Sequence, residues 1–158
     1  MRSWISLCEN FEAHPFDEFF HASREPLKIG TVLEYRGGSG MDLEVEEILE
    51  RFRPAHCRSR KCVYLVNDLS ALDTVVAYYN HLYIVEPESD LERYDAVWLN
   101  RIWSGLAAQD NGEEFSDEEQ RRIALGYWSG APCPRIIGED VAWEFLCDAA
   151  TIVEEIEE

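Results

Sequence analysis

A histidine, His21, follows two phenylalanines near the start of the chain, in the stretch Phe19–Ser23. An imidazole at such a place does one of two things: it packs as a hydrogen-bonded core side chain, or it contacts a ligand through a ring nitrogen. A lone histidine beside phenylalanines is more often structural. The choice between the two depends on whether side chains able to bind the same ligand recur downstream.

Three further segments place a polar or aromatic side chain inside a short apolar run, as His21 does. They are Val-Tyr-Leu-Val at 63–66, Leu-Tyr-Ile-Val-Glu-Pro at 82–87 and Trp-Glu-Phe-Leu at 143–146. The sequence has no Gly-x-Ser-x-Gly, His-Glu-x-x-His or strand-following Gly-x-Gly-x-x-Gly motif, so the common hydrolase, zinc-protease and dinucleotide fingerprints are absent. His56, Cys57 and Cys62 have no second Cys/His pair at a zinc spacing, and no metal site is predicted.

Apolar periodicity predicts the elements that hold these segments. Strands are expected at 19–20, 31–35, 61–66, 82–85, 143–147 and 151–153. Helices are expected at 42–53, 69–79 and 91–108, and from a Ser116–Glu119 capping box to about Gly126. Because strands and helices come in mixed order without a regular βαβ repeat, the predicted fold class is α+β, in a single domain over 1–158.

The charge balance restricts the partners. The chain has 32 acidic and 14 basic side chains and a formal net charge of -18, much of it at 42–50, at 113–119 and in an acidic tail at about 154–158. Such a field repels phosphates, so it disfavours nucleic acid. The acidic runs are first interpreted as solvated helix faces and a solubilising tail; the second interpretation is attraction to a basic protein partner, or mimicry of an acidic one. No apolar run is long enough to span a membrane, and the first residues lack a secretory h-region, so a cytoplasmic location is expected.

The cysteines agree with that location. Their number, five, is odd, and they are scattered from Cys8 to Cys147. An odd number at wide spacing argues against a disulfide framework and fits a reducing compartment.

The order of the four segments resembles the His-Tyr-Glu branch of the ADP-ribosyltransferase fold, which includes the poly(ADP-ribose) polymerases, the RNA 2'-phosphotransferases and the rifamycin ADP-ribosyltransferases. In that branch an early strand reads Phe/Tyr-His-Gly-Thr/Ser, similar to 20–23, and a Val/Ile-Tyr-Phe strand leads into a helix, similar to 63–66. The rifamycin enzymes continue with Ile-Tyr-Ile-Val-Glu-Pro, close to 82–87. The likeness covers about His21–Pro87 well and the C-terminal part loosely. It implies two small antiparallel sheets packed with peripheral helices.

This resemblance implies NAD+ as the co-substrate, bound first by the early strand. His21 would donate a hydrogen bond to the adenine-ribose hydroxyls. The backbone of Ala22 would pair with the nicotinamide amide, and Ser23 completes the cofactor-binding motif. Arg24 would contact the pyrophosphate, a role that matters because the overall field of the protein is hostile to anions.

The remaining implied roles concern the nicotinamide end. Tyr64 and one tyrosine of the Tyr78/Tyr79 pair would sandwich the nicotinamide ring. With His21 and Tyr64, an acid would complete the catalytic set by binding the nicotinamide-ribose 2'-OH and stabilising an oxocarbenium-like transition state. Glu144 is our choice, because it lies near the start of an edge-like late strand, whereas the rifamycin-type enzymes take an acid shortly after Val-Glu-Pro.

Two departures from the family pattern leave alternatives open. Ala22 stands where the family has glycine, so a methyl group is added at the closest approach to the ligand. The rifamycin pattern would make Asp90 or Asp95 the catalytic acid in place of Glu144.

The leading prediction is an ADP-ribosyltransferase that uses NAD+, with a protein as the expected acceptor and a nucleic acid or a small molecule as the alternatives. Hydrolysis to free ADP-ribose is a variant of the same chemistry. The alternative is a catalytically inactive acidic protein that keeps this fold for interaction or inhibition. A phosphotransferase acting on RNA ends is disfavoured, because it needs a basic groove and the 14 basic residues are scattered.

Overall fold

The structure is a computed structural model, and it describes residues 10–11, 17–35, 43–75, 79–135 and 140–156. In this part of the chain the strands form two four-stranded antiparallel sheets, with the orders β1-β6-β7-β4 and β2-β5-β8-β3. The α+β class that the sequence predicts and the two antiparallel sheets that the resemblance implies are therefore confirmed. None of the helices described is both long enough and apolar enough to cross a membrane.

The elements have the following bounds. The first sheet contains β1 (Asn10–Phe11), β6 (Leu91–Asp95), β7 (Trp143–Cys147) and β4 (Val63–Leu65). The second contains β2 (Phe19–Ser23), β5 (His81–Pro87), β8 (Ala149–Ile156) and β3 (Val32–Glu34). The helices are α1 (Leu43–Arg51), α2 (Leu72–Val75) directly after a 3-10 turn (Leu69–Ala71), α3 (Val97–Asp110) and α4 (Asp117–Trp128).

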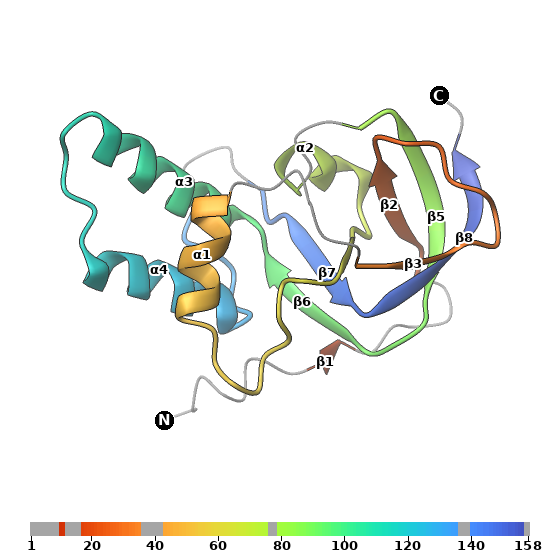
Figure 1. The fold of residues 1–158 in the computed structure, drawn as a ribbon, viewed down its shortest axis with the longest axis horizontal. Helices are drawn as coiled ribbons and strands as arrows, with labels where there is room; N and C mark the ends of the chain where they lie inside the picture. Colours follow the sequence, from red (N-terminus) through yellow and green to blue (C-terminus); the bar gives the residue numbers. More distant parts are fainter. Residues whose placement is uncertain (1–9, 12–16, 36–42, 76–78, 136–139, 157–158) are drawn as a thin grey trace.

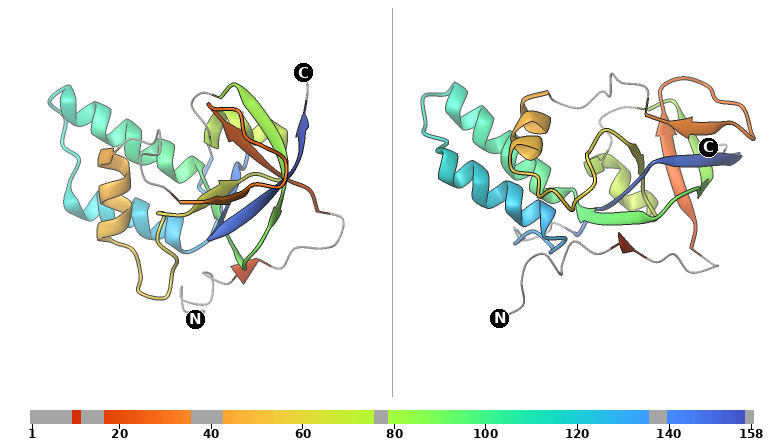
Figure 2. Two further views of the ribbon diagram at one scale, coloured as in Figure 1. Left: turned by 45° about the vertical axis from the view of Figure 1, so that its right-hand side comes forward. Right: turned by 60° about the horizontal axis from the view of Figure 1, so that its bottom comes forward.

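The first sheet is the middle layer of the molecule. Leu65 and Phe145 on one of its faces pack against Phe19 and other residues of the second sheet. The Phe19 and Phe145 rings meet edge to face, with their centroids 5.2 Å apart. Leu146, on its other face, packs in the cluster that includes α1, α3 and α4. These three helices lie together on the side away from β2, β5 and β8, in each of the views (Figures 1 and 2).

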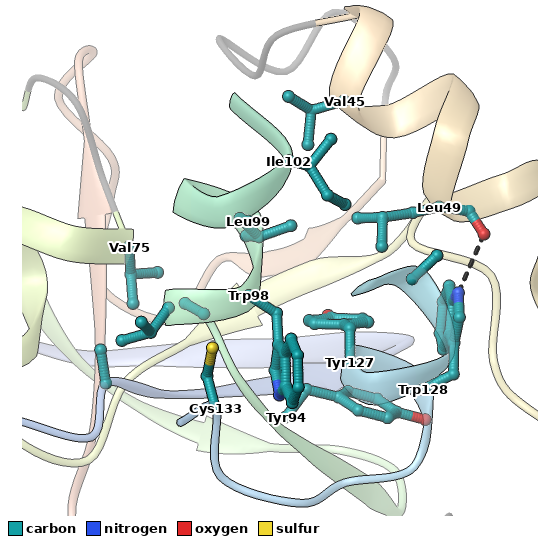
Figure 3. Close-up of a cluster of buried hydrophobic side chains, with 14 of the residues drawn as sticks. Val45, Leu49, Val75, Tyr94, Trp98, Leu99, Ile102, Tyr127, Trp128 and Cys133 are labelled. Atoms are coloured by element: carbon teal, nitrogen blue, oxygen red, sulfur yellow. Dashed lines mark hydrogen bonds between the residues drawn. The ribbon is translucent and has the colours of Figure 1, made fainter. Parts of the chain in front are cut away.

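An aromatic centre holds the helices to the middle sheet (Figure 3). The Tyr94 ring of β6 stacks on the Tyr127 ring of α4, with their centroids 4.7 Å apart, and the Trp128 ring meets both edge to face. The Trp128 indole donates a hydrogen bond to the carbonyl oxygen of Leu49 in α1 at 2.9 Å. One residue of α4 thus ties together α1 and the sheet.

Gly126 sets the closeness of α3 and α4, because a Cβ there would lie 2.5 Å from the Trp98 indole of α3. We expect Gly126→Ala to lower the free energy of unfolding by about 1–2 kcal/mol, since the overlap with a buried ring outweighs the better helix propensity of alanine. Urea denaturation measures this change. Gly126→Ala should destabilise the Trp98→Leu variant less than it destabilises the wild type, because the smaller side chain relieves the overlap. If the two substitutions have additive effects on the free energy of unfolding, the contact is contradicted.

Two of the expected helices differ from the structure. Leu91–Asp95 is the strand β6, and the helix expected over 91–108 begins at Val97 as α3. Leu91 faces the second sheet and Tyr94 faces the helices. A strand buried on both faces loses the alternation that identifies strands, so the periodicity was misleading here. Of the helix expected over 69–79, the first turn is the 3-10 turn and Leu72–Val75 is the α-helix α2, while 76–78 lie outside the described residues.

The C-terminal end also differs from the expectation. Glu154 and Glu155, which the sequence assigns to an acidic tail, lie in β8 opposite Ile84 and Tyr83 of β5. Residues 157–158 lie outside the described residues. The start of α4 is as predicted, because the Ser116 hydroxyl accepts a hydrogen bond from the Glu119 N–H at 3.2 Å.

Candidate functional site

The two sheets meet at β2 and β4, the strands that carry His21 and Tyr64. Phe20 and Val66 form an isolated bridge there, in which the Phe20 N–H donates to Val66 O at 2.7 Å and the Val66 N–H donates to Phe20 O at 3.0 Å. Continued antiparallel pairing would bring Ala22 opposite Tyr64. Instead, Nδ1 of the His21 ring forms a hydrogen bond with the Tyr64 carbonyl oxygen at 3.1 Å, and the strands separate.

Within the described part of the chain, this separation leaves the peptide groups of Ala22 at a strand edge that no other strand pairs with. In an antiparallel ladder the N–H and C=O of one residue point to the same side, and alternate residues point to opposite sides. Phe20 directs both groups towards β4, so Ala22 directs its own two groups the same way, away from β5. Because β2 is at the edge of its sheet and Ala22 is half-buried, a donor and an acceptor lie side by side on the edge that faces β4.

The contact with Tyr64 also fixes the protonation state of His21. A carbonyl oxygen only accepts hydrogen bonds, so Nδ1 must carry the proton. Burial lowers the pKa of His21, and the hydrogen bond to the Tyr64 carbonyl offsets part of this effect. The ring is therefore neutral at pH 7, and its Nε2 is an acceptor. The donor role that the resemblance implies for His21 is reversed: Nε2 would accept from a ligand hydroxyl.

A pH dependence of stability follows from the lowered pKa of His21. As pH falls through 6.5, the ordinary value, the unfolded chain binds a proton that the folded protein resists. Stability should therefore decrease below about pH 6.5 and level off below the pKa of the folded state. Urea denaturation between pH 5 and 8 should show a smaller decrease for His21→Gln than for the wild type. The variant of exposed His56, His56→Gln, is the control, and equal slopes for His21→Gln and the wild type would contradict the assignment.

Tyr64 is held on the side of β4 that faces the helices. Its hydroxyl donates to the carbonyl oxygen of Arg60, and the Arg60 guanidinium lies 5.0 Å from the ring centroid. Burial raises the pKa of the Tyr64 phenol, so it remains a neutral aromatic group. Tyr79 is half-buried against the same core cluster, and Tyr78 lies outside the described residues. Tyr79 is thus the described candidate for the second stacking ring.

The other residues of the early motif lie just beyond the open edge. Ser23 is engaged in a local turn, where its hydroxyl donates to Glu25 O at 2.7 Å and accepts from the Glu25 N–H at 3.2 Å. Arg24 is exposed, and its carbonyl accepts from the Asn80 side chain at 3.2 Å. This places a guanidinium at the surface near the end of β2.

The strand that carries Glu144 is not edge-like, contrary to expectation. β7 pairs with both β6 and β4, and Glu144 is fully buried. Its Oε1 accepts hydrogen bonds from Arg60 Nη1 and from the Tyr127 hydroxyl. Its Oε2 is buried with no hydrogen-bond partner. The cause of the difference is Arg60, an ion-pair partner 84 residues away that makes a buried carboxylate tolerable at this place.

The two alternative acids have different environments. Asp95 is fully buried and holds three backbone amides: Oδ1 accepts from Val97 at 3.0 Å and Ala142 at 3.3 Å, and Oδ2 accepts from Cys133 at 2.8 Å. It fixes the start of α3, and both its oxygens are occupied. Asp90 is exposed, and its carbonyl receives a 3.4 Å contact from Arg58.

The three residues predicted to be catalytic are connected in a chain of contacts. His21 contacts Tyr64, Tyr64 contacts Arg60, and Arg60 contacts Glu144. Burial alone would lower the pKa of Arg60, but the charge of Glu144 and its neighbours outweighs burial and raises it. Sequence reasoning missed Arg60. The signal that was present is the basic run at 58–61, unusual in so acidic a chain, directly before a buried strand.

The described residues contain no group of three His, Cys, Asp or Glu side chains placed to hold a metal ion. Cys57 is disulfide-bonded, which the sequence-based expectation of reduced cysteines did not include. Cys62, Cys133 and Cys147 are free and buried. Burial raises the pKa of Cys147 to about 11 and that of Cys62 still further, so neither is a ready nucleophile at neutral pH.

No protein-family model and no curated protein matches this sequence. A function is therefore inferred from the side chains and peptide groups where β2 and β4 separate.

Proposed function

We propose that this protein binds NAD+ where β2 and β4 separate and transfers its ADP-ribose to a nucleophile, releasing nicotinamide. The observation that carries the proposal is the open peptide edge at Ala22, next to His21 and Tyr64. A primary carboxamide has one N–H donor and one C=O acceptor on the same side. It matches the acceptor and donor of a single strand-edge residue through two hydrogen bonds.

The remaining contacts follow from the chemistry of the side chains. Nicotinamide would stack on Tyr64 and Tyr79, and Nε2 of His21 would accept from a ribose hydroxyl. Arg24 would pair with the pyrophosphate. The C1'–N bond breaks with its electron pair leaving on nicotinamide, the acceptor forms a new bond to C1' and loses its proton, and Glu144 stabilises the positive charge that develops on the ribose.

This reading assigns the chain to an ADP-ribosyltransferase-like fold of the His-Tyr-Glu type. Two antiparallel sheets, with the His21 strand beside the Tyr64 strand, support it. The net charge of -18 supports a basic protein as the acceptor, because the field attracts a basic surface and repels nucleic acid.

The burial of Glu144 favours a second candidate: a protein of this fold that binds a partner or NAD+ without catalysis. A carboxylate held by Arg60 and Tyr127 does not contact a ligand in the arrangement described. Turnover requires a change that brings it within reach.

Thermal unfolding with NAD+ and the release of nicotinamide test both candidates. Ligand at 100 times its Kd stabilises a protein by about 2.7 kcal/mol, so millimolar NAD+ should raise the Tm measurably. Nicotinamide should stabilise the protein more than nicotinic acid, because the carboxylate lacks the donor that Ala22 O requires. Stabilisation without nicotinamide release would favour the non-catalytic candidate. No stabilisation at millimolar NAD+ would exclude the cofactor assignment.

A further inference from the structure

Arg60 lies between two carboxylates that come from different elements. Its Nε and Nη2 contact Glu46 of α1 at 2.9 and 3.0 Å, and its Nη1 donates to Glu144 of β7. Tyr127 of α4 donates to the same Glu144 oxygen and accepts from Arg60 Nη1. The Arg60 and Glu144 side chains are 3% and 1% exposed, so water does not screen their contacts.

These contacts give the two carboxylate oxygens of Glu144 different environments. Oε1 is occupied by a guanidinium and a phenol, whereas Oε2 is buried without a partner. Unpaired buried carboxylate oxygens are rare in folded proteins, and each calls for a specific explanation. A clamp on Oε1 fixes the plane of the carboxylate and keeps Oε2 available to accept one further hydrogen bond.

Arg60 holds Tyr64 as well as Glu144. Its carbonyl accepts from the Tyr64 hydroxyl, and its guanidinium lies over the ring. The ring is thereby fixed at its hydroxyl end and covered on one face by the guanidinium. One side chain thus sets the orientation of two of the three residues in the proposed catalytic set.

We propose that Arg60 is a positioning residue of the NAD+ site, which orients Glu144 through Oε1 and Tyr64 through its ring and hydroxyl so that Oε2 accepts from the ligand ribose. The inference rests on the proposed function. Glu144 is fully buried, so the ribose reaches Oε2 after neighbouring side chains move, and Arg60 preserves the orientation of the carboxylate during that change. Glu46 supports the guanidinium from α1.

The test compares the affinity for NAD+ with kcat in variants of Arg60 and of Glu46, its ion-pair partner. Removing the charge at Arg60 would leave buried Glu144 uncompensated and endanger folding, so Arg60→Lys and the more exposed Glu46→Gln are used. We expect kcat to fall about 10²-fold in Arg60→Lys and about tenfold in Glu46→Gln, because small displacements of a reacting group have effects of this size. The Kd of NAD+, measured calorimetrically, should change less than twofold. Glu47→Gln, an exposed neighbour on α1, should leave both kcat and Kd unchanged.

The outcomes separate the inference from the function on which it rests. A structural role alone would lower the Tm and leave kcat per folded molecule unchanged, and this result in Arg60→Lys and Glu46→Gln would overturn the inference. A higher kcat in either variant would also overturn it, since Arg60 would then restrain the acid. If the wild type neither binds nor cleaves NAD+, the proposed function fails and the inference fails with it.

Discussion

Glu144→Gln should reduce nicotinamide release at saturating NAD+ by about 10²–10³-fold, the usual effect of removing one electrostatic contact to the transition state. Glutamine keeps the shape of the side chain, and its carbonyl oxygen can accept from Arg60 and Tyr127 as Oε1 does. Its NH2 group then replaces Oε2, so a donor stands where the ribose hydroxyl needs an acceptor. The negative charge that would stabilise the oxocarbenium-like ribose is also lost. NAD+ binding should persist, because His21 and Ala22 are unchanged.

The substitution also affects folding, and a matched control separates the two effects. Breaking a buried ion pair typically costs about 3–5 kcal/mol, but Glu46 remains bound to Arg60 and should reduce the loss. Glu92 is the matched acid: it is buried on the same sheet face, accepts from the Tyr94 hydroxyl at 2.6 Å and pairs with Arg58 at 3.3 Å. Glu92→Gln should destabilise the protein comparably and retain turnover per folded molecule. Equal turnover losses in the two variants would contradict a chemical role for Glu144.

Local signals in the sequence predicted much of the fold. The Ser116 cap, the amphipathic face of α1 and the apolar core of β7 each depend on neighbours within a few residues, and each is confirmed. β6 was misread because the second sheet buries one of its faces and the helices bury the other, and most of these contacts come from residues distant in sequence. Periodicity reports which faces are buried, and it becomes ambiguous when both are.

The sequence predicted which residue types form the candidate site, but it did not predict their burial or their hydrogen-bond partners. Phe20-His21-Ala22 and Tyr64 come together because neighbouring strands bring their segments into contact. The state of Glu144 depends on Arg60 and Tyr127, 84 and 17 residues away, and no local pattern announces a buried ion pair. From sequence alone, a charged residue in a strand is predicted to face solvent, because its buried partner is not known. The environment of Asp95 was unpredictable for the same reason, since two of its three amide partners, Cys133 and Ala142, lie 38 and 47 residues away.

Ala22→Pro should weaken NAD+ binding at least tenfold with little effect on stability. Proline lacks the N–H that would bind the nicotinamide carbonyl, and a hydrogen bond left unmade at a partly buried site costs about 1–3 kcal/mol, where 1.4 kcal/mol is tenfold in Kd. The Ala22 N–H points away from β5, so the β2–β5 ladder loses no hydrogen bond. Proline is tolerated at such positions on edge strands, and His21 before it already has the extended backbone that proline requires.

Ala22→Gly is the control, because glycine keeps the N–H and removes the methyl group. It should bind NAD+ at least as tightly as the wild type, and tighter binding would show that the methyl at this position hinders the ligand. Titration with nicotinamide and nicotinic acid identifies the contact: Ala22→Pro should bind nicotinamide more weakly and narrow the preference for it over nicotinic acid. Wild-type affinity for NAD+ in Ala22→Pro would exclude the open edge of β2 as the carboxamide site, whatever the role of Glu144.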